Sequence, residues 1–276
     1  MTTNYLYKNT SAKFLEIYGP DSISFIQNLI TNDINECEEN HFLYSCLLTP
    51  QGKFFADFFI FKKNDKYVFE IHKKYFNNFI QKLLIYKLQS NIEIKEFNSM
   101  NSFIIFGDAH ILSKYEIFNS DPRNKNIGNK LIQQSNNIQF KNNMIEINEE
   151  KYHEILIKNK VPYSPYDLKE NQSLLLENNF DNLNSISWSK GCYIGQEITA
   201  RMKYRALLKK QLYSLKIISG KFQIGDDIVL KDKNLGKIIT KVNEFILCMM
   251  KIDLVDEKSK NKEKIEIDDA SVLEFL

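Results

Sequence analysis

The sequence lacks the features of secreted, membrane-spanning and metal-binding chains. No apolar run approaches the roughly eighteen residues of a membrane span, and residues 1–8 contain no apolar core or cleavage site of a secretory signal. The four cysteines, at positions 37, 46, 192 and 248, form no CxxC pair, which argues against a disulfide framework and indicates a reducing compartment. The four histidines have no ligand spacing, so no metal site is predicted. We therefore expect a soluble, cytoplasmic protein without a membrane partner.

The chain also has few arginines and a small net charge. The formal net charge is only +2, too small to attract a nucleic acid by bulk charge, and no direct nucleic-acid binding is expected. Of the 37 basic residues only Arg123, Arg201 and Arg205 are arginines. Against this lysine-rich background, an arginine indicates a position that needs the planar guanidinium or its permanent charge.

The most informative stretch runs from Lys190 to Glu197 and reads KGCYIGQE. Two glycines bracket Cys192, and the residues after the second glycine are typical of a helix that begins there. Unpaired N–H groups at a helix N-terminus favour a thiolate, and Lys190 and Arg201 add positive charge nearby in the sequence. The alternative is that Cys192 is a small buried apolar residue, as most free cysteines are.

The first two thirds of the chain predict an α+β architecture with antiparallel sheets, because strands and helices alternate without regular βαβ spacing. Strands are expected at 13–18, 42–48, 53–61, 67–72, 92–94 and 103–106, and helices at 23–30, 75–88 and 152–160. The polar residues 119–137 predict an exposed loop.

Three acidic or amide side chains in this region allow two interpretations. Asp57 lies among phenylalanines, so it either faces solvent, which is the favoured interpretation, or is buried with a partner. Asn32 and Asp33 either line a site or form the polar end of a helix.

After Arg205 the pattern changes to short, closely spaced strands at 211–218, 227–231, 236–242 and 244–251. This spacing predicts a small β-barrel or sandwich. The charged residues 256–264 predict an exposed loop before a final strand.

Together these motifs resemble the YgfZ family of folate-binding, iron–sulfur-maintenance and tRNA-modifying proteins, which are relatives of the glycine-cleavage aminomethyltransferase. The resemblance spans residues 14–205. Four stretches carry it: Gly19–Asp21 through Phe25–Gln27 to Thr31–Asp33; Leu48–Gly52; Asp121–Arg123 with Gly128; and Lys190–Glu197 with Arg201.

The resemblance implies an aminomethyltransferase-like folate-binding fold. Residues 1–205 would form two interleaved, ferredoxin-like α+β subdomains around a central cavity for tetrahydrofolate, and residues 206–276 a small C-terminal β-barrel. Cys192 would be the functional thiol, within the motif residues Lys190, Gly195, Gln196, Glu197 and Arg201. The implied cofactor-binding residues are Tyr152, whose ring can stack on a pterin, Glu177, whose carboxylate can pair with the pterin edge, and Asn32, Asp33 and Asp57.

The chain departs from the aminomethyltransferases at two places. Their Gly-Gly-x-x-Asp-Asp segment corresponds to a stretch that ends Phe55-Ala56-Asp57, with one acid, and their Arg-x-Glu-x-Gly run corresponds to residues 156–160, LIKNK. The hypothesis placed first is therefore a non-enzymatic accessory factor for [4Fe–4S] enzymes, including those of tRNA thiomethylation, that meets iron–sulfur client or assembly proteins. The alternatives are a tetrahydrofolate-dependent aminomethyl or one-carbon transferase, with Asp57 or Asp33 as its base, and a binding module without chemistry.

Overall fold

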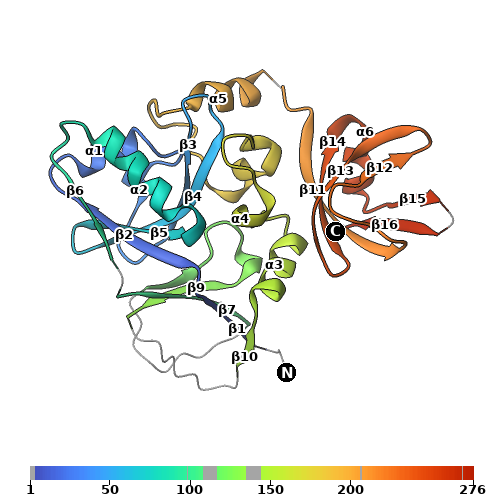
Figure 1. Cartoon of the computed structure of the whole chain (residues 1–276), viewed down its shortest axis with the longest axis horizontal. Coiled ribbons are helices and arrows are strands. Elements are labelled where there is room, and N and C mark those ends of the chain that lie inside the picture. The colour runs from blue at the N-terminus through green and yellow to red at the C-terminus, as the bar shows by residue number, and fades with distance from the viewer. Residues whose placement is uncertain (1–3, 98, 108–116, 135–143, 206, 269) are drawn as a thin grey trace.

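The computed structural model describes residues 4–97, 99–107, 117–134, 144–205, 207–268 and 270–276. Two five-stranded sheets occupy the first part of the chain, and a six-stranded sheet occupies the last part (Figure 1). Short helices and turns of the middle of the chain lie between these parts.

The first sheet is antiparallel and carries helices on one face. Its strands, in spatial order, are β3 (Leu43–Leu48), β4 (Phe54–Lys63), β5 (Lys66–His72), β2 (Ala12–Tyr18) and β6 (Glu93–Glu96). Helices α1 (Ser22–Gln27) and α2 (Lys73–Lys87) pack against it through apolar side chains. Phe79 of α2 contacts Phe58 and Phe69, with ring centroids 5.0 and 6.0 Å apart. The strands and helices predicted for this region are confirmed.

The second sheet contains the first strand of the chain, which the sequence pattern did not predict. Its order is β10 (Ile145–Ile147), β1 (Tyr5–Asn9), β7 (Asn101–Phe106), β9 (Asn129–Gln133) and β8 (Ile117–Ser120). Strand β1 pairs in parallel with β10 and antiparallel with β7. The chain thus starts in the second sheet, builds the first, and returns.

The third sheet is the barrel-like body at the C-terminal end (Figure 1). Its strands are β12 (Asp227–Leu230), β13 (Lys233–Val242), β14 (Phe245–Lys251), β11 (Lys210–Ser219), β16 (Ser271–Phe275) and β15 (Lys264–Asp268). The edge strands β12 and β15 approach each other, so the sheet nearly closes and the predicted barrel is confirmed. The exposed loop predicted at 256–264 is wrong in part, because α6 (Ile252–Lys260) buries Val255 and Ser259.

Helix α3 (Glu149–Lys158) joins the two parts of the molecule. Its Ile157 packs among apolar side chains of the third sheet, including Leu212 and Phe245. A polar bridge reinforces this contact: Asp167, in α4 (Ser164–Asp167), accepts a hydrogen bond from Thr240 Oγ1 at 2.6 Å and contacts His153 Nε2 at 3.0 Å. The domain boundary at residues 205 and 206 stays a prediction.

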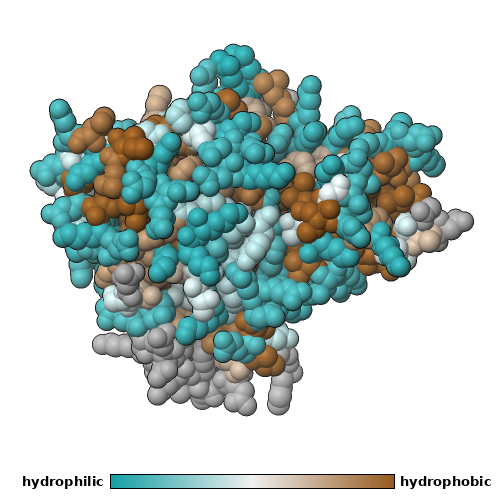
Figure 2. Space-filling view, viewed as in Figure 1, coloured by the Kyte–Doolittle hydropathy of each residue, from teal (hydrophilic) through white to brown (hydrophobic). Residues whose placement is uncertain are grey.

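The face of the molecule drawn in Figure 2 is mainly polar. Figure 2 shows hydrophobic residues in separate patches within a largely hydrophilic face. Among the described helices, none has both the length and the apolar character required to cross a bilayer.

Candidate functional site

Cys192 lies on a short loop, Lys190–Gly195, which we call the cysteine loop. The loop leads directly into α5 (Gln196–Tyr204), and Gly195, with a φ of 81°, is the residue that precedes the helix. The predicted helix start is therefore confirmed. Cys192 is exposed, whereas the other three cysteines are buried. The interpretation of Cys192 as a buried apolar residue is wrong.

The beginning of the cysteine loop is fixed by the ammonium group of Lys190. It donates hydrogen bonds to the main-chain carbonyls of Gln27, Ile30 and Asn32 at 2.7, 2.8 and 2.7 Å. These carbonyls lie at and just beyond the end of α1, where helix geometry leaves acceptors unpaired. Burial lowers the pKa of Lys190 to about 8, and the charge of Asp33 opposes this effect.

The end of the cysteine loop is fixed by close backbone packing on the turn Thr49–Gly52. A Cβ atom on Gly195 would lie 2.4 Å from the Thr49 carbonyl oxygen and 2.8 Å from Leu48 Cβ. A Cβ on Gly52 would lie 2.8 Å from the Gly195 carbonyl oxygen. Only glycine permits this approach at both positions. The exposed middle of the loop is thus held from both sides.

Alanine substitutions at the two loop glycines are expected to differ in their effect on stability. Gly195→Ala combines a left-handed φ with a clash, and we expect it to lower the free energy of unfolding by more than about 1–2 kcal/mol. Gly191→Ala meets no atom within 4 Å and should change stability by less than about 0.5 kcal/mol. Urea unfolding measures both. Equal losses would contradict the close packing at Gly195.

The two cations that the motif places near Cys192 in sequence have other partners. The Lys190 ammonium points to the α1 carbonyls, and Arg201 Nη2 forms an exposed ion pair with Glu197 Oε1 at 2.5 Å. The exposed side of α5 therefore carries a neutralised ion pair rather than a free cation.

Asn32 and Asp33 lie beside the Lys190 anchor. Asn32 donates from Nδ2 to the carbonyls of Tyr44 and Asn184, and Asp33 accepts from Gln27 Nε2. These bonds stabilise the turn after α1. Hydrogen bonds to Asp33 lower its pKa, although burial alone would raise it.

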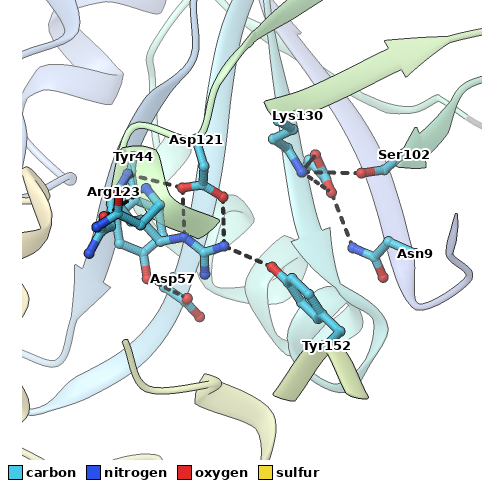
Figure 3. A network of polar contacts seen from close by, with 11 residues as sticks. Asn9, Tyr44, Asp57, Ser102, Asp121, Arg123, Lys130 and Tyr152 are labelled. Carbon is cyan, nitrogen blue, oxygen red and sulfur yellow. Dashed lines mark hydrogen bonds and ion pairs between the residues drawn. The ribbon is translucent and has the colours of Figure 1, made fainter. Parts of the chain in front are cut away.

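A buried ion pair lies between the two sheets of the first part (Figure 3). Arg123 donates to Asp121 from Nε at 3.0 Å and from Nη2 at 2.8 Å, and Nη2 also donates to Tyr152 Oη at 2.9 Å. Burial would lower the pKa of Arg123, but the charge of Asp121 raises it well above its usual value. The exposed loop predicted at 119–137 is therefore wrong at these residues; its positions 135–137 lie outside the described residues.

A second buried pair joins the same two sheets. Lys130 of β9 lies 2.8 and 2.7 Å from the two carboxylate oxygens of Glu70 in β5, and it also donates to Ser102 Oγ. Asn9 Nδ2 donates to the same carboxylate (Figure 3). Both pairs were missed because a polar run predicts exposure.

A cavity of about 50 Å³ lies among these pairs, with Asp57, His72 and Tyr152 in its wall. Asp57 is half-buried and accepts hydrogen bonds from the hydroxyls of Tyr44 and Ser164, so the solvent-facing interpretation is wrong. His72 Nδ1 accepts from the Lys74 amide, which places the proton on Nε2. That Nε2 is buried without a partner among the described residues.

Comparison with known proteins shows what this chain is similar to. No protein-family model matches the sequence. The chain is 23% identical over 221 residues to a mitochondrial iron–sulfur cluster assembly factor IBA57 homolog of Mycosarcoma maydis, covering 73% of this chain and 54% of that protein. It is 24% identical over 241 residues to the tRNA-modifying protein YgfZ of Blochmanniella pennsylvanica, covering 73% of this chain and 68% of the relative. The chain is a relative of the YgfZ and IBA57 proteins.

The fold agrees with this relationship. A crystal structure of glycine cleavage system aminomethyltransferase T from Bartonella henselae matches with a TM-score of 0.70 at 7% identity, covering 99% of this chain and 85% of that one. The predicted α+β fold of the aminomethyltransferase type is thus confirmed. The chain spans about half the length of the fungal IBA57 homologs that it matches.

The cavity between the two sheets is too small for a folate. Pockets for drug-sized ligands measure about 300–1,000 Å³, and the 50 Å³ found here is closer to the space of ordered water. Tyr152 is only 4% exposed, and its ring already stacks on Tyr7 at 4.3 Å. Both Asp57 oxygens already accept hydrogen bonds.

The predicted residues fall into three places. The motif residues gather at the cysteine loop, with Asn32 and Asp33 behind it. Tyr152 and Asp57 meet at the cavity. Glu177 is half-exposed on the short helix η3 (Leu176–Asn178), next to α5, and does not line the cavity.

Proposed function

We propose that this chain is an accessory protein for the assembly or repair of iron–sulfur enzymes, including those of tRNA thiomethylation, and that Cys192 is its functional thiol. The observation that carries the proposal is the exposure of this cysteine on a loop fixed at both ends. A fixed loop offers the sulfur to a partner in one geometry, and little conformational entropy is lost when the partner docks. The names of the IBA57 and YgfZ relatives support the assignment.

The chemistry open to Cys192 requires a second protein. Iron–sulfur clusters are usually held by four thiolates, and within the described part of the chain no group of three or more His, Cys, Asp or Glu side chains could hold a metal ion. Cys192 would therefore act as one transient ligand, with the others supplied by an iron–sulfur client or assembly protein. Gln196, Glu197 and Arg201 would form the surface that meets this partner, while Lys190 and Gly195 hold the loop.

Tetrahydrofolate enters this proposal only through the family likeness. Because the cavity is smaller than a folate, the proposal routes no step through this cofactor. The same mismatch weakens the transferase alternative, since Asp57 is occupied by two hydroxyl donors and Asp33 stabilises a turn. The cytoplasmic location stays a prediction, and the IBA57 relatives are named as mitochondrial.

The test is the activity of a [4Fe–4S] enzyme in cells that lack this protein, grown under oxidative stress. Supplying the chain should restore that activity, whereas the activity of an enzyme without a cluster should be the same in all cells. The proposal fails if the cluster enzyme keeps full activity without the chain, or if the enzyme without a cluster loses as much.

A further inference from the structure

A cleft of about 510 Å³ opens at the junction between the first part of the chain and the third sheet. Leu183, of the short helix η4 (Phe180–Leu183), and Leu212 of β11 contribute apolar lining. The volume lies within the range of about 300–1,000 Å³ that is typical of small-molecule sites. The cleft is ten times larger than the central cavity and is separate from the cysteine loop.

Two lysines in the cleft wall have no counter-ion. Lys160 follows α3, Lys262 follows α6, and neither forms an ion pair with any residue that the structure describes. Both lysines line the cleft, and burial and the charge of Lys262 lower the pKa of Lys160. The cleft also holds an acid, Asp256, but Lys260 pairs with it at 2.6 Å. An anion between Lys160 and Lys262 would offset their repulsion.

A buried hydroxyl supplies a hydrogen-bond donor at the same place. Tyr213 is only 5% exposed, and its Oη atom is buried without a hydrogen-bond partner in the described part of the chain. Burial and the charge of Asp256 raise the pKa of Tyr213 to about 12, so the hydroxyl keeps its proton at neutral pH. Buried hydroxyls are normally satisfied, and this unsatisfied one belongs to a residue of the cleft wall, which points to an acceptor that enters the cleft.

Both lysines also occupy backbone conformations that suit glycine. The φ angles are 58° for Lys160 and 53° for Lys262. A lysine side chain in the left-handed region costs stability, and here each one brings a cation to the cleft. Lys231, on the turn between β12 and β13, has a φ of 47° but does not line the cleft.

We propose that this cleft binds a small phosphate-bearing molecule. Lys160 and Lys262 neutralise the phosphate, and Tyr213 Oη donates a hydrogen bond to it. Phosphate is favoured over carboxylate because lysine acts as a point charge on phosphate, whereas paired recognition of carboxylates uses the planar guanidinium of arginine. No arginine lines the cleft. The site is independent of the proposed role of Cys192.

Calorimetric titration of the full chain with pyrophosphate at low salt tests the proposal. We expect saturable binding at one site, weakened about tenfold or more by Lys160→Gly and by Lys262→Gly. Tyr213→Phe should weaken binding less. Lys231→Gly is the matched control, because it removes a lysine from the same backbone conformation outside the cleft, and it should bind as the wild type does.

Thermal unfolding separates binding from folding. Lys160→Gly relieves a left-handed lysine, so its Tm without ligand should equal or exceed that of the wild type while its response to pyrophosphate is lost. The absence of saturable binding would overturn the proposal. So would equal weakening by all three glycine variants, which indicates unspecific charge attraction, or equal binding of the tricarboxylate tricarballylate, which removes the preference for phosphate.

Discussion

Replacement of Cys192 by serine is expected to abolish the rescue of [4Fe–4S] enzyme activity without a change in stability. The side chain is exposed, so the loss of a sulfur atom removes no buried contact. Serine keeps the size of the side chain but is a poor iron ligand and is not ionised at neutral pH. Rescue is measured in cells that lack the protein, and the free energy of unfolding is measured with urea, where we expect a change below about 0.5 kcal/mol.

The control is a substitution at a buried cysteine. Cys37 is buried, and burial raises the pKa of its thiol to about 12. Cys37→Ala should lower stability modestly and still rescue the enzyme. In the folded wild type, a maleimide should modify Cys192 alone. Full rescue by Cys192→Ser would show that the thiol is not needed and would favour a binding module without chemistry.

A second large effect, on stability, is expected at the buried Asp121–Arg123 ion pair, which lies between the first two sheets. Asp121→Ala leaves the Arg123 guanidinium buried without its carboxylate, and such uncompensated charges cost about 3–5 kcal/mol. Tyr152 Oη remains as a partner of Arg123 but cannot neutralise it. Denaturant unfolding followed by circular dichroism measures the loss.

Two further variants identify the cause of that loss. Glu197→Ala breaks an arginine–carboxylate pair that is exposed, and we expect it to cost less than about 1 kcal/mol. The double variant Asp121→Ala with Arg123→Leu removes the stranded charge and should recover part of the stability lost in the single variant. If Asp121→Ala lowers the free energy of unfolding as little as Glu197→Ala does, Arg123 is hydrated rather than buried.

The cysteine loop was largely predictable from the sequence because its rules are local. A glycine before a helix, a turn at Thr49–Gly52 and the alternation of β4 each depend on a few neighbouring residues. The same holds for the strands of the third sheet. Local rules do not predict the long-range hydrogen bonds of Lys190, because its partners lie in another part of the chain.

The buried pairs and the cleft were hidden for a related reason. Residues 119–134 are polar, and polarity predicts exposure unless a partner for each charge is known. The partner of Lys130 is Glu70, 60 residues earlier. Strand β1 was missed because it is short and its pattern is not alternating. The scarcity of arginine and the family-like stretch Asp121–Arg123 were the sequence signals that pointed to Arg123.

The anchoring of the cysteine loop also has a consequence for how the chain folds. The bond from Lys190 to Gln27 joins residues 163 positions apart, and contacts of such sequence separation form slowly because a long loop must close first. During synthesis the N-terminal residues can fold before Lys190 is made. The thiol therefore reaches its working position late, and a folding intermediate with both early sheets in place would still lack it.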